Sequence, residues 1–269
     1  MTDRRGLAVV TGASSGIGLA FAQRLAADGH PLLLVARREE RLREITQRLA
    51  AQHGVDVGFV VADLASVDGR ATCRDAIDAV GGDVDTVVLN AGFGAMGTVA
   101  AVGRERQTEM VALNCEAVVD LACHVLPAMI ARGSGDVIVV SSAAAFQPIP
   151  YTATYAATKA FELFFVEALS TELHGTGVRA IAACPGPTAT EFGQVSGASA
   201  GPRWMPRETA EGVVAATMHA LDRGRVRVAT GGLSRVTSVL AAVLPRRVIV
   251  WGAGVLHRKF ARSDVGHGH

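Results

Sequence analysis

A tyrosine and a lysine four residues apart stand out because both residue types are rare in this chain. Its 269 residues include two tyrosines and two lysines, against 24 arginines, yet Tyr155 and Lys159 share the stretch TYAATKA. On a helix, residues four apart lie on one face, with Cβ atoms about 5–6 Å apart. A neighbouring ammonium lowers the pKa of a phenol, so the pair has the chemistry of a proton donor and acceptor. The alternative is a chance pairing on a helix surface, and the other motifs in the sequence distinguish between these two interpretations.

A glycine-rich turn lies near the N-terminus, in the stretch TGASSGIG at residues 11–18. A strand-like run precedes it and an amphipathic helix follows, a setting in which backbone N–H groups and a helix N-terminus hold a pyrophosphate. Glycines would permit the tight turn, the approach of phosphate, and close packing of helix and sheet. Unless this is an ordinary glycine-rich turn, its candidate dinucleotide contacts are Gly12, Ser14, Ser15, Gly16, Ile17 and Gly18.

Two arginines follow the second strand-like run, in the stretch LLLVARREE. Proteins that bind NAD usually carry an acidic residue there for the ribose 2′-hydroxyl, whereas an arginine accommodates the 2′-phosphate of NADP. Arg37 and Arg38 stand at this position, and two guanidinium groups suit a dianionic phosphate. We therefore expect NADP(H) rather than NAD(H). The alternative, a solvated residue in the first turn of the next helix, applies more readily to Arg38 than to Arg37.

The segments around these motifs alternate between strand and helix. Strand-like apolar runs lie at residues 7–11, 31–36, 57–62, 84–90, 136–141, 178–184 and 225–229. Helical periodicity lies at 16–28, 38–52, 67–80, 104–132, 153–174 and 206–223. Strands that are apolar throughout, each followed by a helix, predict a parallel sheet covered on both faces. The sequence thus predicts a single Rossmann-type, doubly wound α/β domain of about seven strands over residues 1–230, followed by a C-terminal helical extension over residues 231–269.

Composition and charge narrow the function classes. Hydrophobic residues make up 49% of the chain, enough for a sizeable core, and the net charge of +1 gives no case for nucleic acid. The four cysteines form no CxxC pair, which favours a reduced, cytoplasmic protein. The N-terminal stretch MTDRRGLAVVTG has no signal-peptide core. The eight histidines show no ligand spacing such as HExxH, so we expect no metal site.

Taken together, these motifs resemble the short-chain dehydrogenase/reductase family in its single-domain form, over residues 5–230. The turn T-G-x-x-x-G-x-G, the Y-x-x-x-K pair and a serine thirteen residues before the tyrosine all match. The resemblance implies a catalytic set of Asn114, Ser142, Tyr155 and Lys159. Besides the turn, the arginines, Tyr155 and Lys159, it implies cofactor contacts at Asp63, Leu64, Asn90, Ala91, Gly92, Pro185, Gly186, Thr188 and Thr190.

The resemblance also implies a mechanism, the interconversion of a carbonyl and an alcohol. Tyr155 would donate a proton to the carbonyl oxygen while hydride arrives at the carbon from the nicotinamide, and Ser142 would hydrogen-bond the developing oxyanion. Asn114 would hold a water that links Lys159 to solvent, and Lys159 would hold the nicotinamide ribose, a task that suits an ammonium better than the planar fork of arginine. The alternative is a dinucleotide-binding regulatory or scaffolding protein with little turnover, which would not need all four residues.

The substrate is the least determined part of this interpretation. In the family's layout, the stretch after Ser142 and the stretch TEFGQVSGASAGPRWMP border the reacting centre. Both carry little charge, so we expect a mostly apolar pocket for a hydrophobic ketone, aldehyde or secondary alcohol. Its candidate lining is Phe146, Ile149, Phe192, Trp204 and Met205. The glycine- and serine-rich stretch 193–201 is expected to be a lid that orders on binding, unless it is an ordinary loop.

Residues 231–269 lie beyond the core resemblance. Two nine-residue uncharged runs, VTSVLAAVL and VIVWGAGVL, flank the sequence Pro245-Arg246-Arg247 and are too short to span a bilayer. Six basic residues against one acid suit a helical pair that lies on an anionic membrane or covers the substrate mouth. A cap packed into a subunit interface is the alternative. A homodimer or homotetramer is also expected, because the helices predicted at 104–132 and 153–174 carry more apolar surface than one sheet face needs.

Overall fold

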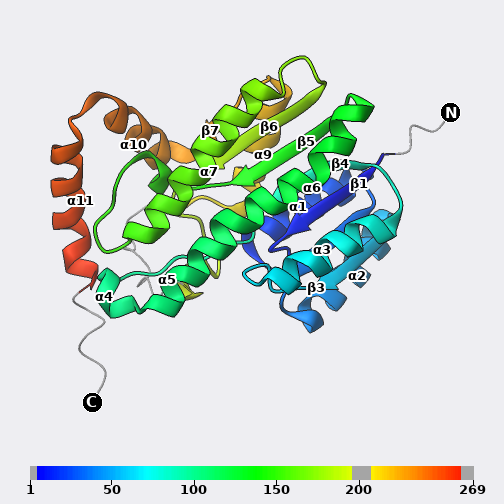
Figure 1. Cartoon of the computed structure of the whole chain (residues 1–269), viewed down its shortest axis with the longest axis horizontal. Helices are drawn as coiled ribbons and strands as arrows, with labels where there is room; N and C mark the ends of the chain where they lie inside the picture. The colour runs from blue at the N-terminus through cyan, green and yellow to red at the C-terminus, as the bar shows by residue number, and fades with distance from the viewer. Residues whose placement is uncertain (1–4, 196–206, 262–269) are drawn as a thin grey trace.

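The computed structural model describes residues 5–195 and 207–261, and within them seven parallel strands form one sheet (Figure 1). The strands are β1 Leu7–Thr11, β2 Leu32–Ala36, β3 Val57–Val61, β4 Val84–Leu89, β5 Gly135–Val140, β6 Val178–Cys184 and β7 Arg227–Ala229. Their spatial order is β3-β2-β1-β4-β5-β6-β7. The predicted doubly wound sheet is confirmed. The last strand is shorter than expected, since β7 is an edge strand that pairs over three residues with the end of β6.

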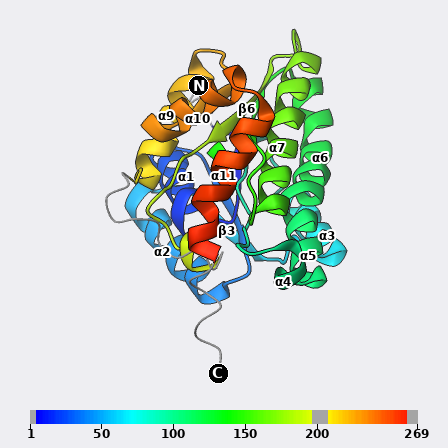
Figure 2. The same cartoon turned by 90° about the vertical axis from the view of Figure 1, so that its left-hand side faces the viewer.

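Helices cover both faces of the sheet. The α-helices are α1 Gly16–Ala27, α2 Glu39–His53, α3 Val67–Val80, α4 Val99–Val102, α5 Arg104–Val111, α6 Ala117–Arg132, α7 Ala153–Glu172, α8 Phe192–Val195, α9 Ala210–Asp222, α10 Gly231–Val243 and α11 Arg246–Ala261. One layer holds α1, α2 and α9, and the other holds α3, α6 and α7 (Figure 2). Along β1 the side chains alternate between the layers: Leu7 and Val9 join one core, Ala8 and Val10 the other.

Local sequence sets where several helices begin and end. Ser66 accepts a hydrogen bond from the N–H of Gly69 and caps α3, and Thr209 accepts one from Gly212 and caps α9. The Thr209 cap starts α9 at residue 210, four residues later than the periodicity predicts. The helix α2 ends at Gly54, whose φ of 68° suits a residue without a Cβ.

The long helix predicted at 104–132 contains an irregular turn. A π-helical segment, η1, spans Ala112–Glu116 between α5 and α6, and hydrophobic periodicity alone gives no sign of it. The helical stretch Arg104–Arg132 is long and apolar enough to cross a membrane, but core helices of soluble proteins meet the same criteria of length and composition. Its α6 part packs on the sheet through Val118, Leu121 and Val125, which are buried. It is therefore a core helix of this fold.

The C-terminal extension forms the expected helical pair at the carboxyl edge of the sheet. Ser234 in α10 is fully buried, and its hydroxyl donates to the carbonyl of Cys184 at the end of β6, at 2.7 Å. A Cβ on Gly254 of α11 would lie 3.4 Å from Cγ of Pro150, so α11 packs over the loop that precedes α7. Figure 2 shows α11 crossing in front of this edge, between the two helical layers.

The strand order reverses between β1 and β4, because β1 continues to β2 on one side and β4 to β5 on the other. In open parallel sheets, ligands bind in the crevice at the carboxyl ends of the strands on either side of such a reversal. The fold therefore directs attention to the turns after β1 and β4.

Candidate active site

The turns after β1 and β4 are tied together by hydrogen bonds. The Thr11 hydroxyl accepts from the backbone N–H of Asn90 at 2.9 Å and of Ala91 at 3.0 Å, and Nδ2 of Asn90 donates to the Thr11 carbonyl at 2.9 Å. Gly12 has φ 65°, and a Cβ there would lie 2.7 Å from Nδ2 of Asn90. A Cβ on Gly18 would overlap the Gly12 carbonyl. Both positions require glycine, as the sequence indicates.

The helix α1 starts directly after this turn. Ser15 is its N-cap residue but makes no capping hydrogen bond through its side chain, and no acidic residue lies in the first turn of α1. The first backbone N–H groups, around Gly16 and Ile17, therefore remain for an anion at the positive end of the helix. A pyrophosphate fits this chemistry.

Arg38 lies against the same turn. Its Nε and Nη2 donate to Oγ of Ser14 at 3.1 and 2.9 Å, and Nη2 also donates to Oγ of Ser15 at 2.8 Å. Its Nη1 donates to Glu191 at 2.8 Å, and Arg41 donates to the other oxygen of that carboxylate at 2.5 Å. Hydrogen bonds from Arg38 and Arg41 lower the pKa of Glu191 to about 2. Two guanidinium groups and two hydroxyls thus form a cluster that holds a carboxylate beside the glycine-rich turn.

Arg37 takes a different direction. Its Nη1 lies 3.8 Å from Asp63, the acid after β3, and 3.6 Å from Glu109 on α5. The Arg37 side chain is 57% exposed and that of Arg38 is 43% exposed, so the more solvated residue is Arg37 rather than Arg38. Leu64, next to Asp63, is buried in the core. The two arginines that follow β2 in sequence therefore face different groups.

Tyr155 and Ser142 lie at the carboxyl end of β5. Nζ of Lys159 lies 5.9 Å from the centroid of the Tyr155 ring. Burial raises the pKa of Tyr155, while the charge of Lys159 and a hydrogen bond from Ser142 lower it. Burial has the larger effect, so the pKa of Tyr155 lies above its ordinary value and the phenol is protonated at neutral pH. Oγ of Ser142 also accepts from the N–H of Ala144 at 3.1 Å, which caps η2, a 3₁₀ turn over Ala143–Phe146.

Lys159 is buried between β5 and α7. Its Nζ donates to the carbonyl of Val140 at 2.9 Å and to the two carboxylate oxygens of Glu162 at 2.9 and 3.0 Å. A Cβ on Gly92 would lie 3.4 Å from this nitrogen, which places the ammonium beside the turn after β4. Ser141, the residue before Ser142, is also buried, and its hydroxyl donates to the Lys159 carbonyl at 2.8 Å.

Asn114 lies in the π turn η1 and is fully buried. Its Oδ1 accepts from the N–H of Phe93 at 3.1 Å, and its Nδ2 donates to the Phe93 carbonyl at 3.0 Å and to the Thr158 hydroxyl at 2.9 Å. The amide therefore joins the N-A-G turn to α7. The described hydrogen bonds of this side chain are with Phe93 and Thr158 rather than with Lys159.

The segment after β6 closes over the turn after β1. The Pro185 carbonyl accepts from the N–H of Ala143 at 2.8 Å, and the Gly186 N–H donates to Glu208 at 3.0 Å. The Thr188 hydroxyl donates back to the Gly186 carbonyl at 3.0 Å. A Cβ on Gly16 would lie 3.0 Å from Cγ2 of Thr190, so this segment packs on the glycine-rich turn. The predicted contacts from Pro185 to Thr190 are thus brought to the crevice.

Apolar groups border the tyrosine. The rings of Phe192 and Tyr155 lie 5.5 Å apart, and a Cβ on Gly94 would meet both, at 3.2 and 3.1 Å. Ile149 is buried, and Phe146 packs against the core beneath η2. Trp204, Met205 and residues 196–201 of the predicted lid lie outside the described residues.

Five residues that contact this region are not predicted by the sequence motifs. They are Arg41, Gly94, Glu162, Glu191 and Glu208. Glu162 left a signal, because it follows Tyr155 by seven residues and so shares its helical face, in the otherwise apolar stretch AFELFF. Glu191 and Glu208 left none, since their partners come from distant segments.

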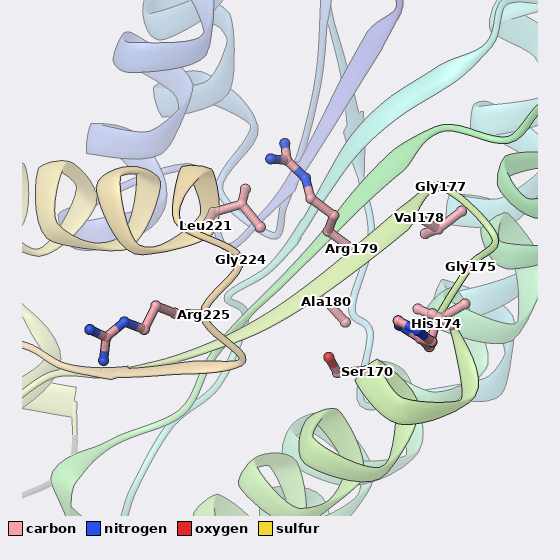
Figure 3. A pocket seen from close by; sticks show the side chains of 11 residues that line it. Ser170, His174, Gly175, Gly177, Val178, Arg179, Ala180, Leu221, Gly224 and Arg225 are labelled. Carbon is pink, nitrogen blue, oxygen red and sulfur yellow. The ribbon is translucent and has the colours of Figure 1, made fainter.

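Two other features do not belong to this region. Burial raises the pKa of the Cys184 thiol to about 12 and of Cys115 to about 11, so neither is a thiolate near neutrality. A cleft of about 350 Å³ lies at the amino end of β6, where His174, Arg179 and Arg225 project (Figure 3). That edge of the sheet is opposite to Tyr155, and Asp136 holds the Arg179 guanidinium through two hydrogen bonds.

Comparison with known proteins extends these observations. The family model described as short chain dehydrogenase matches residues 6–200. A short chain dehydrogenase of Pseudocercospora fijiensis is 36% identical over 188 residues, which are 69% of this chain and 60% of that protein, less than two thirds of its length. A short-chain dehydrogenase from Sphingobium yanoikuyae, solved with NADPH, superposes with a TM-score of 0.78, 30% identity, and 90% and 94% of the two chains covered. The bulky-bulky ketone specific alcohol dehydrogenase of Comamonas testosteroni gives a TM-score of 0.76, 25% identity, and 90% and 96% coverage.

Proposed function

The chain belongs to the short-chain dehydrogenase family and is an oxidoreductase that acts on CH–OH groups, and we propose that it interconverts an apolar ketone or aldehyde and its alcohol with NADP(H). The observation that carries this proposal is the setting of Tyr155. Its phenol is protonated and accepts a hydrogen bond from Ser142, and its ring lies 5.5 Å from that of Phe192.

The proposed cofactor is NADPH rather than NADH. The cluster of Arg38, Arg41, Ser14 and Ser15 already binds a carboxylate and has the charge that a 2′-phosphate needs. The glycine turn and the start of α1 suit the pyrophosphate, and Asp63 suits the adenosine end. The similarity to a dehydrogenase solved with NADPH supports the same choice. Asn90, Ala91, Gly92, Lys159 and the segment from Pro185 to Thr190 would hold the nicotinamide half.

The residues of the chain would then perform the proton transfer. NADPH, when bound, supplies the hydride. The phenol of Tyr155 would donate its proton to the substrate oxygen, and the Ser142 hydroxyl would donate a hydrogen bond to the same oxygen as negative charge develops. Lys159 would stabilise the resulting phenolate through its charge. Asn114 would keep the turn after β4 and the helix α7 in register for these steps.

The proposed substrate is apolar and bulky. Phe192 and Gly94 border Tyr155 and are uncharged, and the similar Comamonas enzyme is specific for bulky ketones. In this proposal residues 1–230 form the catalytic domain, and the extension beyond them covers the substrate mouth through the contact of Gly254 with Pro150.

Two exposed apolar faces support proposals about assembly. On α7, Phe161 and Phe164 are exposed, and Phe161 stacks on Phe165, an arrangement that suits a second copy of the chain in a homodimer or homotetramer. On the C-terminal pair, Trp251 is 73% and Val243 75% exposed. No acidic residue lies between Asp222 and Asp264, so we place this face of a cytoplasmic protein against an anionic membrane.

The test is a panel of aliphatic, aromatic and bulky ketones and aldehydes with NADPH or NADH, followed by the loss of reduced-nicotinamide absorbance. We expect turnover with NADPH on bulky apolar carbonyls and little on charged ones. Tight NADPH binding with no turnover on any of these carbonyls, nor on the matching alcohols with NADP, would contradict the proposal and favour a dinucleotide-binding regulatory protein.

A further inference from the structure

A second charged residue is buried with Lys159, and the reaction described above does not use it. Glu162 is 1% exposed, and both of its carboxylate oxygens lie within 3.0 Å of the Lys159 Nζ. Glu162 follows Lys159 by three residues on α7, so the helix itself sets their spacing. The Val140 carbonyl, at 2.9 Å, is a third acceptor for the ammonium.

Such a pair is costly to bury, so its presence needs a reason. Burial lowers the pKa of a lysine and raises that of a carboxyl, because both charged forms lose hydration. Here burial lowers the pKa of Lys159, but the Glu162 carboxylate counters it and the net direction is upward. Burial raises the pKa of Glu162 to about 7, with Lys159 opposing. The carboxylate is therefore what allows a buried ammonium to exist beside Tyr155.

We propose that Glu162 is a positioning residue for the reaction: it holds Lys159 as an ammonium, between the Val140 carbonyl and the ring of Tyr155. Glu162 acts through the lysine and touches neither substrate nor nicotinamide. The inference rests on the proposed function, since a charged Lys159 matters to catalysis only if Tyr155 donates a proton. It goes beyond that function because it adds a residue to the four that the motifs supply.

The groups that face this pair are few. Tyr155 and Lys159 lie on the same helix, Cys115 faces it from η1 and Cys184 from β6. Both thiols have raised pKa values, about 11 and about 12, and are neutral at working pH. Among these groups, Glu162 is the one whose oxygens contact the ammonium, at 2.9 and 3.0 Å.

The composition of the chain allows Lys159 to be titrated directly. The sequence has two lysines, so Lys259→Arg leaves Lys159 as the sole one, and its ¹³Cε resonance in lysine-labelled protein reports its protonation. In this background we compare the parent with Glu162→Gln, which keeps the size and an amide oxygen but removes the charge. The control is Glu167→Gln, the same change on the same helix, at a residue paired with Arg227 on β7.

We expect the Lys159 pKa to fall by at least about one unit in Glu162→Gln, because an opposite charge at contact distance shifts a pKa by about 1–3 units. Glu167→Gln should leave it unchanged. An unchanged Lys159 pKa in Glu162→Gln overturns the inference. If that variant does not fold, Glu162→Asp decides, because its shorter carboxylate should lower the Lys159 pKa partway, and no change would again contradict the role.

Activity provides the second arm. The basic limb of the pH profile of carbonyl reduction should move to lower pH in Glu162→Gln, with Glu162→Asp between it and the parent. A purely structural residue would lower the rate at all pH values without moving the limb. A shifted Lys159 pKa in a protein without turnover would show that Glu162 keeps Lys159 charged, but it would refute the proposed function and with it the role in catalysis. If Glu162→Gln turns over substrate with the basic limb and the Lys159 pKa both unchanged, the inference about Glu162 is overturned and the proposed function stands.

Discussion

Nη1 of Arg38 lies 2.8 Å from a carboxylate oxygen of Glu191, which joins two segments 153 residues apart. One is the turn that would hold the 2′-phosphate and the other precedes Phe192, next to the tyrosine. A carboxylate therefore stands where the phosphate of the cofactor is proposed to bind, and the two anions would compete for the same guanidinium.

Arg38→Ala should weaken NADPH binding by about tenfold or more and leave NADH binding nearly unchanged. The reason is the loss of charge-assisted hydrogen bonds, each worth about 1.5–3 kcal/mol, which only the phosphorylated cofactor makes. Calorimetric titration of both cofactors checks this. Arg37→Ala is the matched control, with a smaller effect expected because Arg37 faces Asp63 and Glu109. A larger loss in Arg37→Ala would reverse the assignment of the two arginines.

Glu191→Gln should tighten NADPH binding several-fold and leave NADH binding unchanged, because the amide no longer competes with the phosphate for Arg38. The pKa of Glu191 is lowered to about 2, below the ordinary 4.5, so the carboxylate stays charged above about pH 4. The gain should therefore be the same at about pH 7.5 and about pH 8.5, where the 2′-phosphate is also fully ionised. Equal NADPH affinity of the parent and the variant would contradict the proposed competition between Glu191 and the phosphate for Arg38.

The sign of the pH effect on stability follows from the same ion pair. A carboxylate whose pKa is lowered in the folded protein stabilises the fold above its unfolded pKa, and this stabilisation is lost as pH falls through the folded pKa. The Glu191 contribution is thus present at neutral pH and lost between about 4.5 and about 2. Because the group is exposed, the effect should be small and should fade with added salt.

Phe164→Asp should shift the protein toward monomer at micromolar concentration, by light scattering after size-exclusion chromatography. Phe164 is 60% exposed on α7, and an interface that buries it loses about 1.5–3 kcal/mol per copy. Val67→Asp on α3, at a residue 70% exposed, is a control away from this face. A parent that is monomeric from the start contradicts the proposed interface.

Trp251→Gln should reduce binding to anionic liposomes in a sedimentation assay, and added salt should reduce the binding of the parent. Trp251 is highly exposed on α11, where Arg246 and Arg247 are also exposed. Phe164→Gln controls for the loss of any exposed aromatic residue. No salt-sensitive binding by the parent eliminates membrane contact and leaves a subunit contact for this face.

The sheet was predictable from sequence because its inner strands, β1, β2, β4, β5 and β6, are largely buried on both faces. Continuous apolar runs such as LLLVA and VIVV have no other stable setting in an α/β chain. The ends of the strands and helices were harder to predict. The strand β7 pairs over only three residues, and α9 starts where Thr209 caps it. The π turn around Asn114 changes the hydrogen-bond ladder without changing the hydrophobic pattern, so no pattern reveals it.

The site divides in the same way. Tyr155, Lys159 and Ser142 follow fixed spacings and were predictable, as was the glycine turn. The directions of Arg37 and Arg38 were not, because they depend on where the backbone turns into α2 and on Glu191, which arrives from another part of the chain. Glu162 could have been predicted from sequence, since a lone charged residue on the same helical face as Tyr155 is a local signal.

The central claim is that Tyr155 donates the proton in an NADPH-dependent reduction, and Tyr155→Phe tests it most directly. The measurement pairs turnover on a carbonyl that the parent reduces with the Kd for NADPH of the same variant. Removing only the hydroxyl should lower kcat by about 10²–10⁴-fold, the usual contribution of a general acid, and leave the Kd nearly unchanged. Tyr151→Phe, at the other tyrosine of the chain, should retain activity. A Tyr155→Phe variant that keeps most of its turnover would contradict the account.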